Sequence, residues 1–204
     1  MKGFAMKRSI GLVLISILTV LYANGQHMTE LRDVPVTGSD GSATMLRLAE
    51  DRPSVILILG PDCPISQKYI PTIKALHQLF GAKVNFIGIF PGYFTAAEVT
   101  SFAEEYGLTF DWYVDHNMSA ISALHATVTP EAFLLAPDLQ RQYSGAIDNW
   151  FYDLGKYRQK ATEAYLKEAI ESVLAGTPVK TNEKKAIGCV IQQGHHSDGH
   201  DHNH

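Results

Sequence analysis

Two largely apolar runs stand out in the hydrophobic pattern of the chain. Residues 54–59 read SVILIL between Pro53 and Gly60, and residues 83–90 read KVNFIGIF before Pro91. Continuous apolar runs of this length are typical of strands that are buried on both faces of a parallel sheet. The pattern therefore predicts two neighbouring strands at the centre of a covered sheet.

Three longer segments repeat their apolar residues at helical spacing. They cover residues 65–80, 95–106 and 162–175, and each is followed directly by a glycine. The second also begins at Thr95, a residue type that commonly caps helix N-termini, whereas glycine commonly ends helices. We therefore predict an amphipathic helix in each segment.

Shorter patterns complete the predicted order of elements. They are a strand at 31–36 before a turn at 38–41, an aromatic strand at 110–114, a helical segment at 115–125, and two antiparallel strands within 131–138 and 140–147. The resulting order is strand, helix, strand, helix, an inserted segment, two strands and a last helix. This order predicts an α/β fold with a mixed central sheet flanked by helices.

The first 25 residues follow a different pattern. Lys2, Lys7 and Arg8 precede an apolar run over residues 10–22, which small residues follow as far as Gly25. This layout is typical of a secretory signal peptide, and the run is shorter than the roughly 20 residues that span a bilayer. We expect cleavage after residues 1–25 and a periplasmic location without membrane association; an uncleaved anchor is the alternative.

Composition and length limit the possible function classes and the number of domains. The chain has 204 residues, 46% of them hydrophobic, and a formal net charge of −4, so it lacks the basic character of nucleic-acid-binding proteins. The length that remains after the leader suits one domain, which we place at residues 26–180. Residues 181–204 are expected to form a C-terminal tail with a histidine-rich end.

Cys63 is the residue whose sequence context most clearly suggests a reactive side chain. It lies where the first buried run meets a predicted helix. The first amides of a helix lack intrahelical partners and the macrodipole is positive at that end, so a thiolate there is stabilised and its pKa lowered. The charge of the preceding Asp62 is expected to oppose this effect.

The chain has one other cysteine, Cys189. The two residues form a redox centre, a structural disulfide or an unrelated pair, and the order of residues alone does not distinguish these cases. A disulfide needs Cα atoms within about 7 Å of each other. An inert, buried Cys63 is a further alternative.

The text around Cys63 resembles the thioredoxin-like superfamily. Cys63, Pro64, Ser66, Tyr69 and Pro71 spell the Cys-Pro-x-Ser-x-x-Tyr-x-Pro pattern of secreted redoxins, in the alkyl hydroperoxide reductase and thiol-specific antioxidant branch. A proline inside a helix is otherwise costly, by about 3 kcal/mol. The resemblance implies a thioredoxin-like fold with an insert between the active-site helix and a later strand.

Two further segments carry the same resemblance. Thr129-Pro130 precedes an apolar strand, as does the proline that stands in the cis form beside the thiol in this superfamily. The text from Gly188 to Ile191 is similar to the Gly-Cys-x-Ile close of the same proteins.

The resemblance also implies a function and a set of site residues. The expected function is that of a thiol-dependent oxidoreductase that needs no cofactor and acts on a protein disulfide or a peroxide, with a thiol reductant as second partner. The implied residues are Cys63 as nucleophile, Cys189 as possible resolving thiol, and Pro64, Ser66, Thr129 and Pro130 beside the substrate.

The chain departs from the family patterns at three positions. Ser66 replaces the second cysteine of the thioredoxin motif, so no disulfide can form within the motif. Peroxiredoxins carry Pro-x-x-x-Thr-x-x-Cys, and here Ile56 and Gly60 occupy the proline and threonine places. These departures argue against dithiol exchange within the motif and against efficient peroxide reduction.

The histidine-rich end suggests a different class of function. Dense imidazole groups bind Cu or Zn ions even without a fixed fold. The candidate ligands are His195, His196, His200, His202 and His204. The alternatives are therefore a metal-binding thioredoxin-like protein, a catalytically silent thioredoxin-like module, or a tail that only increases solubility.

Overall fold

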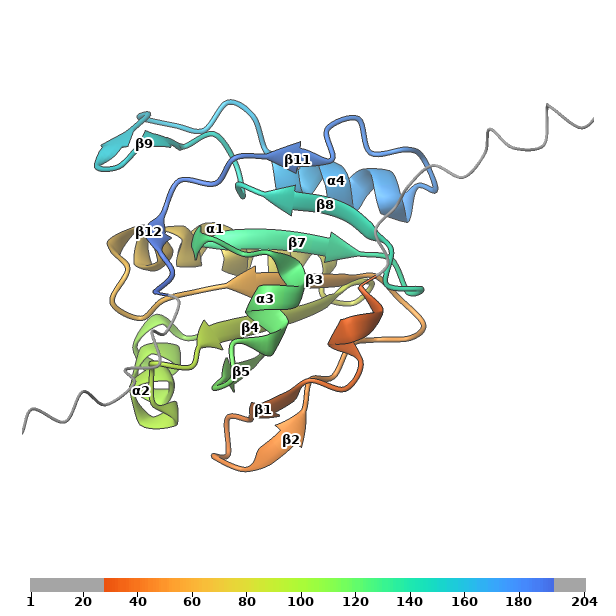
Figure 1. The fold of residues 1–204 in the computed structure, drawn as a ribbon. Helices are drawn as coiled ribbons and strands as arrows, with labels where there is room; N and C mark the ends of the chain where they lie inside the picture. Colours follow the sequence, from red (N-terminus) through yellow and green to blue (C-terminus); the bar gives the residue numbers. More distant parts are fainter. Residues whose placement is uncertain (1–27, 193–204) are drawn as a thin grey trace, which may run out of the picture.

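The computed structural model describes residues 28–192 and is built on a mixed sheet (Figure 1). Within these residues the sheet has eight strands in the order β11-β8-β7-β3-β4-β5-β1-β2. The strands are β1 (Pro35–Thr37), β2 (Ala43–Met45), β3 (Ser54–Ile58), β4 (Asn85–Pro91), β5 (Asp111–Asp115), β7 (Glu131–Leu135), β8 (Arg141–Gly145) and β11 (Glu183–Lys184). The predicted mixed α/β fold is confirmed.

The two largely apolar runs form the centre of this sheet. They are β3 and β4, which pair in parallel, while β3 pairs antiparallel with β7 on its other side. Val55 and Leu57 belong to the core on one face of the sheet, and Ile56 and Ile58 belong to the core on the other. Both faces are apolar because both are covered.

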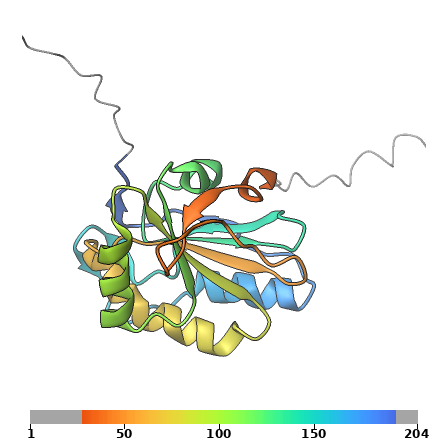
Figure 2. The ribbon, with the colours of Figure 1, turned by 90° about the horizontal axis from the view of Figure 1, so that it is seen from below.

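Helices cover the sheet on its two sides, as Figure 2 shows. On one side lie α1 (Pro64–Phe80) and α4 (Tyr165–Leu174), and on the other lie α3 (Ser119–Leu124) and the 3₁₀ turn Thr29–Leu31. The remaining helix, α2 (Ala96–Tyr106), contributes Val99 and Phe102 to the same core as α1. The described chain is therefore a three-layer structure.

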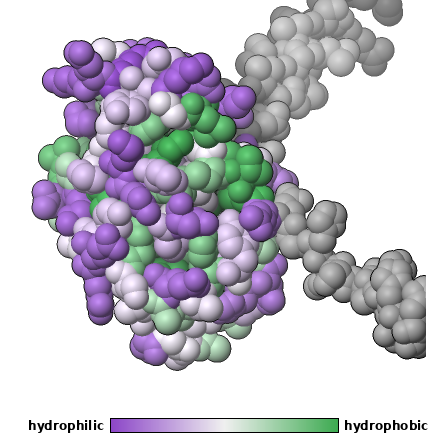
Figure 3. All heavy atoms as spheres, turned by 90° about the vertical axis from the view of Figure 1, so that its left-hand side faces the viewer, coloured by the Kyte–Doolittle hydropathy of each residue, from purple (hydrophilic) through white to green (hydrophobic). Residues whose placement is uncertain are grey.

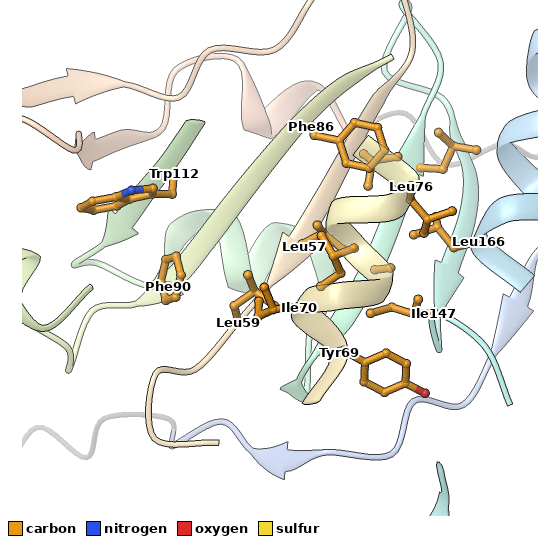
Figure 4. Close-up of a cluster of buried hydrophobic side chains, with 14 of the residues drawn as sticks. Leu57, Leu59, Tyr69, Ile70, Leu76, Phe86, Phe90, Trp112, Ile147 and Leu166 are labelled. Atoms are coloured by element: carbon orange, nitrogen blue, oxygen red, sulfur yellow. The ribbon is translucent and has the colours of Figure 1, made fainter. Parts of the chain in front are cut away.

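The core beneath α1 holds this helix in place. Figure 4 shows Ile70 and Leu76 of α1 among side chains from several strands and from α4, including Leu57, Phe86 and Leu166. Complete burial of one such aliphatic or aromatic side chain contributes about 1.5–3 kcal/mol. The start of α1, where the candidate thiol lies, is thus fixed by tertiary packing.

Helix ends follow the predicted signals. Thr95 and Glu98 form a capping box at the start of α2, and Gly107 ends this helix in the left-handed conformation with φ +59°. Pro71 lies inside α1, as its motif implies. None of the helices in residues 28–192 is long and apolar enough to cross a membrane.

The structure differs from the predictions mainly in its short elements. The expected strand at 31–36 is instead the 3₁₀ turn followed by β1, which pairs with the unpredicted β2. A second unpredicted hairpin consists of β9 (Phe151–Asp153) and β10 (Lys156–Tyr157). Strands of two or three residues are too short to show a period.

The segment after residue 180, expected as a tail, takes part in the fold. Strand β11 pairs in parallel with β8 at the edge of the sheet. The last strand, β12 (Cys189–Val190), pairs antiparallel with β6 (Val128–Thr129). The folded structure thus extends to Ile191, whereas the expected signal peptide and the histidine-rich end lie outside the described residues.

Candidate active site

Cys63 is the N-cap residue of α1 and lies at the junction that follows β3. Its backbone is extended, Pro64 begins the helix, and the Cys63 Sγ accepts a hydrogen bond from the Ser66 amide at 3.5 Å. The side chain is 0% exposed. The predicted thiol at a helix N-terminus is confirmed, and solvent does not reach it in this arrangement.

The Thr129-Pro130 segment faces the same thiol. The peptide bond between these residues is cis, as the resemblance implies. The carbonyl oxygen of Thr129 accepts a hydrogen bond from the Cys63 thiol at 2.9 Å. Both Thr129 and Pro130 are buried. This segment therefore forms one wall of the site.

Cys189 forms a second wall of the site, next to Thr129. Its strand β12 pairs with β6 so that Cys189 stands opposite Thr129. The Cys189 thiol donates to the Cys63 Sγ across 2.6 Å, and both cysteines are free. A disulfide bond is about 2.05 Å long, so little movement separates these thiols from a bond. The structure brings together two residues that are 126 positions apart.

The two thiols have opposite pKa shifts. Burial alone would raise the pKa of Cys63. Hydrogen bonds from the Cys189 thiol, from the Ser66 amide and hydroxyl, and from the Thr129 hydroxyl stabilise its thiolate and lower the pKa overall. Burial, followed by the hydrogen bond to Cys63, raises the pKa of Cys189 to about 12. The first proton to leave the pair is therefore that of Cys63.

The expected effect of Asp62 on the pKa of Cys63 stays a prediction. The Asp62 side chain is exposed, and the pKa of Cys63 is lowered overall. The negative charge of Asp62 contributes to the raised pKa of Cys189. Asp62 thus increases the difference between the two thiols, because it disfavours ionisation of Cys189.

Ser66 is placed to hydrogen-bond to the Cys63 thiolate and is not exposed to a substrate. It is 0% exposed, and its Oγ accepts a hydrogen bond from the Gly60 amide at 3.3 Å. This leaves its hydroxyl proton free to stabilise the Cys63 thiolate, in agreement with the lowered pKa. Among the residues expected beside the substrate, Pro64 is exposed and Ser66 is covered.

We expect Ser66→Ala to slow alkylation of Cys63 by iodoacetamide about three- to tenfold at pH 7. Loss of one hydrogen bond to a charged group raises the thiol pKa, so a smaller fraction is thiolate at this pH. The midpoint of the rate against pH should move to higher pH. Cys189→Ser, present in both proteins compared, restricts the reaction to Cys63.

The matched control is Ser172→Ala, which removes a helix serine whose Oγ donates to the Glu168 carbonyl in α4. This control should leave the alkylation profile unchanged. A profile for Ser66→Ala that coincides with that of the parent would contradict the assigned role of the Ser66 hydroxyl.

A second motif residue anchors the site through a partner that the sequence did not indicate. The Tyr69 hydroxyl donates to Asp148 Oδ1 at 2.6 Å, and the same oxygen accepts the Trp150 amide at 2.8 Å. Asp148 is buried, 79 residues from Tyr69. No spacing pattern could have revealed this link, which ties α1 to the segment between β8 and β9.

Metal binding has no support in the described part of the chain. Residues 28–192 contain no group of three or more His, Cys, Asp or Glu side chains that could hold an ion. The predicted ligands, from His195 to His204, lie outside the described residues. Metal binding by this segment stays a prediction.

The chain was compared with family models, with curated protein sequences and with solved structures. No family model and no curated protein sequence matches the chain. A hypothetical protein from Sinorhizobium meliloti superposes with a TM-score of 0.70 at 24% identity, over 81% of this chain and 93% of that one.

Two further solved structures resemble the chain at lower scores. A PrxQ mutant from Xylella fastidiosa has a TM-score of 0.56 at 15% identity, over 74% of this chain and 95% of its own. A secreted disulfide oxidoreductase from Mycobacterium tuberculosis has a TM-score of 0.51 at 18% identity, over 72% and 97%. With its strand order, its cis-Pro130 and a cysteine at the start of α1, the chain has the thioredoxin-like fold of the redoxins.

Proposed function

We propose that this protein is a thiol–disulfide oxidoreductase in which Cys63 is the nucleophile and Cys189 the resolving thiol. The observation that carries the proposal is the pair of free thiols, with sulfur atoms 2.6 Å apart at the start of a helix. Their opposite pKa shifts support the assignment of roles, because the thiolate is the attacking species.

The reaction proceeds in two exchanges. The Cys63 thiolate attacks one sulfur of a substrate disulfide, a mixed disulfide forms, and the other substrate sulfur leaves as a thiolate that takes up a proton. Cys189 then loses its proton and attacks the Cys63 sulfur, which releases the second substrate thiol and forms the Cys63–Cys189 disulfide. Two electrons pass to the substrate, and an external thiol reductant restores the protein.

The surroundings of Cys63 favour a disulfide over a peroxide as substrate. Gly60 stands in the place of the peroxiredoxin threonine, and its amide donates a hydrogen bond to the Ser66 hydroxyl oxygen. Ile56, in the place of the proline, is a buried strand residue. The threonine hydroxyl that aligns a peroxide is therefore absent from position 60, whereas an approaching sulfur needs only the thiolate and a path to it.

The proposed location is beyond the cytoplasmic membrane, in the periplasm. The basic and apolar pattern of residues 1–25 supports it. The similar fold of a secreted disulfide oxidoreductase from Mycobacterium tuberculosis agrees with it. Disulfide substrates are abundant in such compartments.

The proposal is tested by oxidation of the pair. Incubation with excess oxidised glutathione should remove both thiols together, with a mass lower by two hydrogens and no lasting glutathione adduct, and dithiothreitol should reverse the change. Cys189→Ser should instead retain one glutathione on Cys63. If both thiols stay free under these conditions, the proposal is wrong.

A further inference from the structure

A short segment of the chain covers the active thiol. Residues 185–191, here called the strap, run from β11 to β12, which lies beside α1 in Figure 1. The strap pairs with β6 and places Cys189 against Cys63. Figure 3 faces this end of the molecule and shows hydrophobic surface between hydrophilic side chains. Val190 of the strap is 76% exposed, while its neighbours Cys189 and Ile191 turn inward.

The strap closes the route to Cys63. The hydrogen-bond partners of the Cys63 sulfur are Ser66 in α1, Thr129 in β6 and Cys189 in the strap. The first two belong to the framework of the fold. Since Cys63 is fully buried, an external disulfide can reach its sulfur only if the strap moves away.

The backbone of the strap lies in close contact with the backbone of β6. At Gly188 an added Cβ would overlap the Thr129 carbonyl oxygen, so only glycine permits this approach. The Ile191 amide donates to the Thr127 carbonyl at 3.0 Å, and the Ile191 side chain is buried. The strap therefore binds as an extended segment that adds to the edge of β6 and carries a thiol to Cys63.

The pairing with β6 is short enough to open. It covers two residues, Cys189 opposite Thr129 and Val190 opposite Val128. The preceding β11 has a separate attachment, since the Lys184 carbonyl accepts the Ala146 amide at 2.9 Å. Segments with few backbone hydrogen bonds open at low free-energy cost. The strap can thus detach while β11 remains in the sheet.

Resting on the proposed function, we propose that the strap and an extended segment of the disulfide substrate bind alternately to the edge of β6. The substrate segment pairs with Val128 and Thr129 in place of the strap, which sets its cysteine beside Cys63. The return of the strap then delivers Cys189 to the mixed disulfide and displaces the product. Resolution and product release are one movement.

The alternation requires no additional chemistry. While the substrate segment occupies the edge, the bond between Cys63 and the substrate sulfur is intact and Cys189 keeps its proton. When the strap returns, Cys189 loses this proton and bonds to Cys63, and the departing substrate sulfur takes a proton up.

The test is hydrogen exchange of the Ile191 amide in full-length Cys189→Ser. Two adducts on Cys63 are compared with the unmodified variant. One is made with the symmetric disulfide of an acetylated five-residue peptide with a central cysteine, and the other with cystamine, which has no peptide backbone. We expect exchange about tenfold faster in the peptide adduct and a clearly smaller increase in the cysteamine adduct.

Each other result has a defined meaning. Protection of Ile191 that is equal in the peptide adduct and the unmodified protein overturns the alternation, although the proposed function survives. Equal loss of protection in both adducts shows that bulk alone expels the strap and also overturns it. Failure to form any adduct on Cys63 rejects the proposed function and the alternation together.

Discussion

Cys63→Ser is expected to reduce the turnover of a dithiothreitol-coupled insulin-reduction assay at least about a thousandfold. A serine hydroxyl is not ionised at neutral pH, so the attacking anion is lost, and no other described residue lies in its place. The measurement is the initial rate at pH 7 with wild type and variant at equal concentration. The Ser172→Ala protein serves as the control for expression and handling.

Cys189→Ser should behave differently in the same assay. It retains the nucleophile, so a rapid release of about one equivalent of substrate thiol should precede a stop, with the other half of the substrate attached to Cys63. A high concentration of dithiothreitol should restore turnover because it replaces the resolving thiol. The reverse pattern, a burst in Cys63→Ser and none in Cys189→Ser, would exchange the two roles.

Gly145→Ala should lower the free energy of unfolding by about 3 kcal/mol or more and should slow formation of the Cys63–Cys189 disulfide. Gly145 has φ +119°, and an added Cβ would overlap the Lys184 carbonyl oxygen of β11. Strain at such a backbone and a steric clash in a packed region each cost about 1–3 kcal/mol. Since β11 leads into the strap, its displacement removes the anchor of Cys189.

Gly155→Ala is the matched control. Gly155 also has positive φ, +71°, but nothing lies within 4 Å of an added Cβ. It should therefore cost about 1 kcal/mol, the backbone preference alone, and leave disulfide formation unchanged. Urea unfolding with both thiols reduced measures the stabilities, and equal losses in the two variants would show that the approach of β11 to Gly145 is unimportant.

The elements that the chain predicted well are those with local causes. The largely apolar runs became β3 and β4 because both faces of the central sheet are covered. The helix signals at Thr95 and Gly107 are satisfied by neighbours within the same turn. The environment of Cys63 follows from the same local rule, since the residue directly before a helix lies at the unpaired amides of its first turn.

The features that sequence reasoning missed depend on distant partners. Strand β12 pairs with residues about sixty positions earlier in the chain, and two residues show no periodicity. Asp148 has no motif of its own, and only the fold places it at the Tyr69 hydroxyl. The effect of Asp62 on Cys189 was missed because only the fold brings these two residues near each other.

Local sequence thus specified a thiol at the start of a helix, in a thioredoxin-like order of strands and helices, with no second cysteine in the motif. Whether that thiol has a partner was decided by tertiary structure. The antiparallel pairing of β12 with β6 sets Cys189 2.6 Å from Cys63, and the cis-Pro130 segment completes the enclosure. Periodicity and capping report only on neighbours along the chain, whereas the meeting of two thiols depends on how the whole sheet is assembled.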